Sequence, residues 1–125
     1  MLTATLVFAL AQSIGGAGTT IDPVAFQAAE CGTQYKIREV NSQTDEGRSI
    51  NARNQKFMIA LMMGKGLPVA RFQEIGGAYK TRFMEIVRKD DEKAAEFLKS
   101  EMLRCDLFVK EQAGELVKQG YGSGG

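Results

Sequence analysis

The sequence predicts an all-α protein, a four-helix bundle of antiparallel helices stapled by one disulfide. Apolar residues recur every three or four positions, and helix caps and breakers divide the chain into four such segments. The only two cysteines, Cys31 and Cys105, fall on the apolar faces of the first and last segments. Short connections make consecutive helices antiparallel neighbours, so we expect one bundle. The expected helices span residues 22–41, 46–63, 68–88 and 91–119.

The first helix has a clear start. Asp22 is a good N-cap, and Pro23 occupies the first helical position, where its missing N–H leaves no bond unmade. Ile21 and Phe26 hold the two positions of a hydrophobic staple. One helical face is then apolar and consists of Val24, Ala28, Cys31 and Tyr35. These features predict an amphipathic helix over residues 22–41.

A polar stretch precedes the second helix, and Ser42, Thr44 and Ser49 are its possible caps. The apolar run 57–63 could also form a buried strand, but Ala, Leu and Met favour a helix. Because this run is apolar all round, we expect it to be the most deeply buried part of the bundle. Gly64 is expected to follow the last residue of the helix.

The third helix is expected to begin at Pro68 and to bury residues spaced by three and four. Gly76 and Gly77 interrupt its pattern, which indicates a close helix crossing or a kink, or alternatively a hinge beside a binding surface. Asp90 or Asp91 is expected to cap the fourth helix.

Residues 1–11 are apolar, uncharged and too short for a membrane span of about 20 residues. Ala9 and Ala11 fit the small-residue pattern of a signal-peptide cleavage site, although no Lys or Arg precedes the run. The alternative is a core strand, but everything after residue 20 reads as helix and leaves a strand without a partner. We therefore expect a signal peptide at 1–11, a flexible lead-in at 12–20, a helical domain at 21–119 and a flexible tail at 120–125.

The signal peptide and the cysteines support each other. Export would place the chain in an oxidising compartment, where Cys31 and Cys105 would form a disulfide. We therefore expect a periplasmic or secreted protein with no transmembrane span in its mature chain.

Charge and composition restrict the function. Sixteen basic and fifteen acidic residues nearly cancel, so no basic excess exists to bind nucleic acid. The chain has no His, which removes the commonest general base and transition-metal ligand. No complete catalytic constellation is recognisable, so we expect neither an enzyme nor a cofactor.

A weak metal motif lies in the second helix. Met58, Met62 and Met63 place two thioethers one turn apart and a third beside them, which would suit Cu(I). Methionine also fills irregular cores, and no polar opening interrupts this apolar run. Core packing is therefore the preferred interpretation, and we expect no metal site.

These observations favour a non-enzymatic protein that acts through protein–protein contact, such as an inhibitor, immunity or accessory protein of unknown partner. The alternative is a carrier of a small apolar ligand, bound between helices 46–63 and 68–88. Six residues would line that pocket: Phe57, Leu61, Met62, Phe72, Tyr79 and Phe83.

Overall fold

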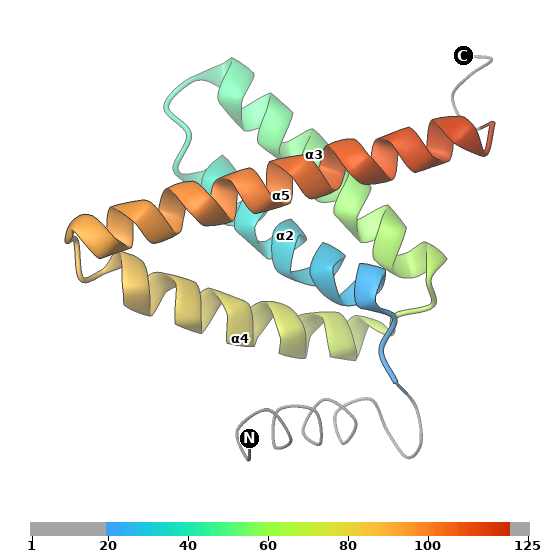
Figure 1. Cartoon of the computed structure of the whole chain (residues 1–125), viewed down its shortest axis with the longest axis horizontal. Coiled ribbons are helices and arrows are strands. Elements are labelled where there is room, and N and C mark those ends of the chain that lie inside the picture. Colours follow the sequence, from blue (N-terminus) through green and yellow to red (C-terminus); the bar gives the residue numbers. More distant parts are fainter. Residues whose placement is uncertain (1–19, 121–125) are drawn as a thin grey trace.

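A computed structural model describes residues 20–120, which form four helices joined by short loops (Figure 1). The helices are α2 (Pro23–Val40), α3 (Asp45–Gly64), α4 (Val69–Val87) and α5 (Glu92–Lys118). The predicted all-helical class and four-helix bundle are confirmed, and no strand occurs among these residues. The described residues do not include the predicted signal peptide at 1–11, the lead-in apart from residue 20, or the predicted tail beyond Gly120.

Side-chain caps set the starts of α2, α3 and α5, whereas α4 follows Pro68 without a side-chain cap. The Asp22 carboxylate accepts hydrogen bonds from the backbone N–H groups of Val24 and Ala25, at 2.8 and 3.2 Å. Thr44 accepts from the N–H of Gly47, which identifies it as the cap of α3. Asp91, rather than Asp90, caps α5. Each bond satisfies a donor that the first helical turn leaves unpaired.

The end of α3 differs from the expectation. Gly64 is still helical, and Lys65 is the C-cap. The left-handed residue is Gly66, with a φ of 78°. A left-handed conformation favours glycine because it has no Cβ. The helix therefore ends slightly later than the predicted residue 63.

Helix α2 is the centre of the bundle and packs against all three other helices (Figure 1). Helices α3 and α4 are consecutive in sequence, yet they have hardly any contact with each other. Both lie against α2 instead. As a result, one side of α2 remains open between them.

Two glycines allow the helices to approach α2 closely. A Cβ added to Gly32 of α2 would lie 3.2 Å from Cβ of Met58 in α3. A Cβ added to Gly76 of α4 would lie 2.5 Å from Oγ1 of Thr33 in α2, closer than the atoms could pack. Nothing lies within 4 Å of the corresponding position on Gly77. Gly76 is therefore a helix-crossing residue, whereas Gly77 does not take part in the crossing.

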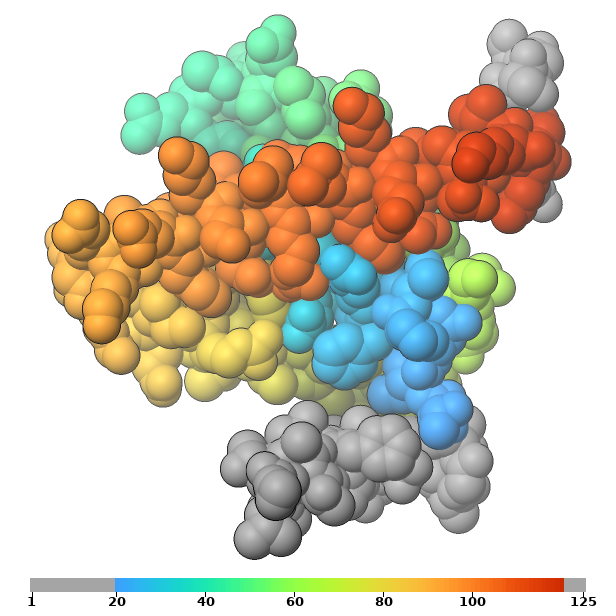
Figure 2. Space-filling model, viewed as in Figure 1, coloured from blue at the N-terminus to red at the C-terminus, as the bar shows by residue number. Residues whose placement is uncertain are grey.

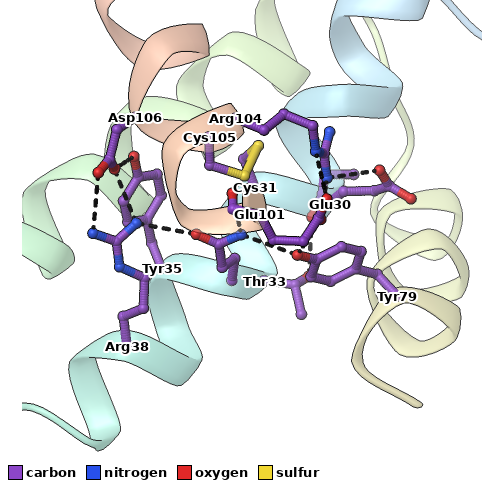
Figure 3. The surroundings of a disulfide bond; sticks show 12 residues. Glu30, Cys31, Thr33, Tyr35, Arg38, Tyr79, Glu101, Arg104, Cys105 and Asp106 are labelled. Atoms are coloured by element: carbon purple, nitrogen blue, oxygen red, sulfur yellow. Dashed lines mark hydrogen bonds and ion pairs between the residues drawn. A yellow bond between two sulfur atoms is a disulfide. The ribbon is translucent and has the colours of Figure 1, made fainter. Parts of the chain in front are cut away.

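The predicted disulfide between Cys31 and Cys105 is present and joins α2 to α5 (Figure 3). Their Cα atoms are 5.4 Å apart, within the range that a disulfide spans. Both cysteines are fully buried. The surrounding core also contains Ala28, Ala29, Tyr35, Met58, Met62, Ile75 and Phe108.

Helix α5 lies across the front of the molecule, and no described segment covers its outer side (Figure 2). Its inner side carries Cys105 and Phe108 into the core. None of the four described helices has a stretch long and apolar enough to cross a bilayer.

Candidate functional site

A buried amide lies beside the disulfide. Gln34 of α2 is completely inaccessible to solvent, although it is polar. Its Nε2 donates to the hydroxyl of Tyr79 in α4 at 3.0 Å and to the main-chain carbonyl of Glu101 in α5 at 2.9 Å. Its Oε1 accepts a hydrogen bond from Arg38 Nη1 at 3.0 Å. The amide is therefore fully hydrogen-bonded and connects three helices.

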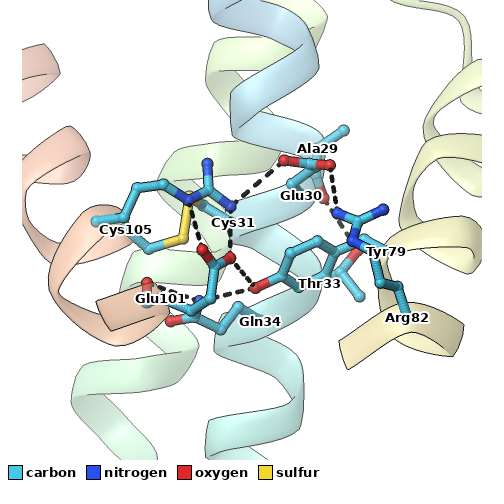
Figure 4. A network of polar contacts seen from close by, with 10 residues as sticks. Ala29, Glu30, Cys31, Thr33, Gln34, Tyr79, Arg82, Glu101 and Cys105 are labelled. Atoms are coloured by element: carbon cyan, nitrogen blue, oxygen red, sulfur yellow. Dashed lines mark hydrogen bonds and ion pairs between the residues drawn. A yellow bond between two sulfur atoms is a disulfide. The ribbon is translucent and has the colours of Figure 1, made fainter. Parts of the chain in front are cut away.

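The carboxylate of Glu101 extends this network toward the surface (Figure 4). It accepts a hydrogen bond from the Tyr79 hydroxyl at 2.9 Å. Arg104 also donates to both of its oxygens, through Nε at 3.2 Å and Nη2 at 2.9 Å. Such two-point contacts fix the relative orientation of the two side chains.

Glu30 of α2 lies between two arginines of the neighbouring helices (Figure 4). Arg82 of α4 donates to one of its oxygens at 3.2 Å, and Arg104 of α5 donates to the other at 3.3 Å. The carboxylate thus links α2 to both helices.

A second cluster lies on the other side of the disulfide (Figure 3). Asp106 of α5 accepts hydrogen bonds from the Tyr35 hydroxyl at 2.6 Å and from Arg38 at 2.9 and 3.3 Å. Since Arg38 also donates to Gln34, the two clusters form one continuous network.

The surroundings of Tyr79, Tyr35 and Glu101 shift the pKa of each of these side chains. Burial raises the pKa of Tyr79 to about 12, and burial together with Asp106 raises the pKa of Tyr35 well above its usual value. Burial alone would raise the pKa of Glu101. The hydrogen bonds from Arg104 and Tyr79, with the positive charges of Arg104 and Arg82, outweigh burial and hold that pKa below its ordinary value. At neutral pH the network thus combines neutral tyrosines with an ionised Glu101.

The network holds helices together rather than offering an open reactive group. Both Nε2 protons of Gln34 and its oxygen are already bonded within the protein. A satisfied buried network of this kind specifies one packing of the core. Within residues 20–120, no cluster of three or more His, Cys, Asp or Glu side chains could hold a metal ion.

A groove of about 400 Å³ lies on the open side of α2. We call it the α2 groove. Helix α2 and its C-cap residue Asn41 contribute most of its lining, with Gln55 of α3 and three residues of α4 completing it. The lining consists of Gly32, Thr33, Lys36, Ile37, Val40, Asn41, Gln55, Phe72, Lys80 and Met84.

The structure distributes the six predicted pocket residues over three places. Phe57 and Leu61 line a different hollow of about 370 Å³, between α3 and the end of α5. Phe72 lines the α2 groove. Met62, Tyr79 and Phe83 are buried in the protein interior. The separation arises because α2 lies against both α3 and α4, which hardly touch.

The three methionines of the weak copper motif do not share one environment. Met58 and Met62 are buried, and both belong to the hydrophobic core. Met63, by contrast, is largely exposed. The expectation that the run 57–63 would be the most deeply buried part of the bundle is therefore wrong, because only Met58 and Met62 of this run are buried, whereas α2 contains seven buried residues.

Helix α5 also has an apolar face that points away from the core. Leu103, Leu107 and Val117 are 58%, 55% and 58% exposed. With Lys110 and Gly114 they recur at alternating intervals of four and three, the spacing of a helix-packing seam. We call these five residues the α5 outer stripe. Nothing lies within 4 Å of a Cβ added to Gly114, so a partner could approach closely there.

Sequence reasoning missed both surfaces and the network. For the network a sequence signal existed, since Gln34 is a polar residue directly beside the core-facing Tyr35 and one turn from Cys31. For the stripe the signal was that Leu103 and Leu107 are apolar but do not lie on the helix face that carries Cys105. The α2 groove had no such signal because it depends on how α3 and α4 diverge.

Comparison with known proteins gives no relative. No protein-family model, no curated protein and no solved structure matches this chain.

Proposed function

We propose that this chain is a non-enzymatic protein, exported to the periplasm or secreted, which binds a partner protein through the α5 outer stripe. The single observation that supports this proposal is the exposure of Leu103, Leu107 and Val117 along one side of α5. Apolar side chains aligned on a helix face are typical of an interaction site.

The rest of the molecule supports a rigid presentation of this stripe. The disulfide and the Gln34 network both attach α5 to the central helix α2. A preordered surface loses less entropy when it binds, which favours affinity. The disulfide is also compatible with export, because such bonds persist in oxidising compartments.

The partner we expect presents an amphipathic helix. Leu103, Leu107 and Val117 would contact its apolar side, and Gly114 would permit close approach of the two backbones. Lys99, Asp106 and Glu111 surround the stripe with both signs of charge, so a partner helix of mixed charge fits best.

Site-specific photo-crosslinking in the native host tests this proposal. A photoreactive amino acid at Leu107 should crosslink one protein reproducibly, whereas the same group at Val69 should not. Val69 is equally exposed but lies on α4, so it is a matched control. The identified protein is then purified, and its affinity is measured for the unmodified chain and for the Leu103→Glu and Val69→Glu variants.

We expect Leu103→Glu to weaken the complex by at least about tenfold, while Val69→Glu leaves it unchanged. Urea unfolding of both variants shows whether the fold is intact. Crosslinks of equal yield at both positions, or crosslinks only between copies of this chain, would contradict the proposal. Sedimentation at several protein concentrations identifies self-association of this chain, because the fraction of oligomer would then rise with concentration.

A second candidate function is the carriage of a small ligand, which the α2 groove favours. Its volume of about 400 Å³ lies within the range of small-molecule sites. Native mass spectrometry of the protein purified from its host should then detect a species with one bound small molecule. Repeated recovery of ligand-free protein, with no small molecule in its organic extract, would count against this candidate.

A further inference from the structure

The α2 groove has an unbalanced charge. Its lining includes two ammonium groups, Lys36 and Lys80, and no carboxylate. Lys36 Nζ lies 3.7 Å from an oxygen of Glu39, so its charge is partly compensated. Lys80 forms no ion pair within residues 20–120. Lys80 is therefore an uncompensated cation on the α4 wall of the groove.

The surroundings of Lys80 do not remove this charge. A smaller hollow of about 210 Å³ adjoins the groove and shares Lys80 and Met84 with it. Glu85 lines that hollow, but so does Arg88, so the two added charges cancel. The local field around Lys80 consequently favours an anion.

The remaining lining of the groove is largely apolar. Ile37 and Val40 come from α2, and Phe72 and Met84 come from α4. Val40 is 69% exposed, which is unusual for an aliphatic side chain next to other apolar groups. The Gln55 amide makes no hydrogen bond within the described part of the chain. It can therefore donate to a ligand.

We propose that the α2 groove binds a free fatty acid, an alkyl chain that ends in a carboxylate. The carboxylate lies on Lys80, with Lys36 and the Gln55 amide as further donors, and the chain covers Ile37, Val40, Phe72 and Met84. This occupant matches both the net positive charge and the apolar lining of the groove. The inference rests on the ligand-carrier candidate and adds the chemical class of its ligand.

Titration with three probes of equal chain length tests the proposal. Dodecanoate, dodecanol and dodecyltrimethylammonium carry a negative, a neutral and a positive head, and each is kept below its micelle concentration. Methyl NMR spectra of the full chain report the position of binding through Ile37, Val40 and Met84. Met63, Leu103 and Val117 serve as internal references, since they are exposed and lie outside the groove.

We expect dodecanoate to shift the groove methyls saturably and to bind at least about tenfold more tightly than dodecanol. Lys80→Met should remove most of this preference, and Lys80→Arg should retain it. Lys93→Met is the matched control, because Lys93 is an exposed lysine of α5 that lies outside both the groove and the α5 outer stripe and should have no effect. Native circular dichroism of each variant excludes unfolding as the cause of a loss.

Each other outcome overturns the inference in a distinguishable way. Equal binding of dodecanoate and dodecanol would refute the anionic class and leave ligand carriage standing. Absence of binding by all three probes would refute both. Shifts confined to Leu103 and Val117 would show nonspecific adsorption on the α5 outer stripe. Contacts between residues 2–11 and the groove methyls would instead identify the chain's own apolar N-terminus as the occupant.

Discussion

Gly76 of α4 lies so close to Thr33 of α2 that a Cβ added to the glycine would be 2.5 Å from the threonine Oγ1. The threonine has little room to move away, because its Oγ1 also donates to the carbonyl oxygen of Ala29 at 2.9 Å. The distance between α2 and α4 at this crossing is therefore set by the absence of one carbon atom.

Gly76→Ala should lower the free energy of unfolding by about 1–3 kcal/mol, because overpacking outweighs the better helix propensity of alanine. Gly77→Ala is the matched control, since nothing lies within 4 Å of its added Cβ. It should stabilise the protein by up to about 1 kcal/mol. Adding Thr33→Ala to Gly76→Ala should restore much of the loss. Urea unfolding of the unmodified protein, Gly76→Ala, Thr33→Ala and the double variant gives this cycle. Equal stabilities of Gly76→Ala and Gly77→Ala would contradict the close crossing.

The disulfide should make a large contribution to stability, because it closes most of the chain into a loop. Cys31 and Cys105 are 74 positions apart, and in the chain-entropy model a loop of this length is worth about 4 kcal/mol. The Cys31→Ala/Cys105→Ala variant should therefore unfold at a much lower urea concentration than the oxidised protein. Reduction of the unmodified chain should have a similar effect. A loss below about 1 kcal/mol would mean that the unfolded chain is already compact without the bond.

The sequence predicted those features of the fold that depend on local chemistry. Asp22 caps α2 as expected, because a capping carboxylate bonds to N–H groups only two and three positions further along the chain. The end of α3 was predicted less accurately, because either Gly64 or Gly66 could terminate the helix. Only the backbone conformation shows that Gly66 is the left-handed residue. The cysteine pair was predictable because the chain offers only one pairing.

The partners of Gln34 and the position of the α2 groove were beyond local patterns. Gln34 contacts Tyr79 and Glu101, which are 45 and 67 positions away, and no spacing rule connects them. The predicted pocket assumed that α3 and α4 face each other because a short loop joins them. Small residues on α2, such as Gly32, instead let α3 pack closely on the central helix. The open space on α2 follows from that packing and not from any periodicity.

Alkaline conditions should destabilise the protein through its buried tyrosines. Folding raises the pKa of Tyr79 from 10.0 to about 12, mainly by burial, and that of Tyr35 also rises. The folded state therefore holds protons that the unfolded state has already released. This stabilisation is complete below pH 10 and is lost as the pH rises through the folded values, by about 1.4 kcal/mol per pH unit for each tyrosine.

Ultraviolet absorbance of the phenolate measures this directly. When the native protein is titrated with base, the phenolate absorbance of Tyr79 and Tyr35 should appear only as the chain unfolds. In urea, all the tyrosines should titrate near pH 10. Tyr79→Phe should remove one tyrosine from the absorbance change that accompanies unfolding. It should also make the loss of stability at alkaline pH shallower. Native titration of every tyrosine at its ordinary pKa, without unfolding, would show that the two hydroxyls are accessible to water.

Acid should act on the same network through Glu101. Its pKa lies below the ordinary value because the hydrogen bonds from Arg104 and Tyr79 outweigh the effect of burial. The stabilisation is therefore present above the unfolded pKa and is lost as the pH falls through the folded pKa. Glu101→Gln retains the shape and the accepting oxygen but removes the charge, so we expect about 1–2 kcal/mol lower stability at neutral pH.

The pH dependence separates this charge effect from a packing defect. Urea unfolding between neutral and acid pH should show a shallower acid decline for Glu101→Gln, so that the two stability curves converge at low pH. Glu111→Gln is the matched control, because Glu111 is an exposed carboxylate on the same helix and should leave the curve unchanged. If the Glu101→Gln curve instead runs parallel to that of the unmodified protein at every pH, the loss comes from packing. The ionised carboxylate would then contribute nothing to the joining of α4 and α5, and Tyr79 and Gln34 would hold the network alone.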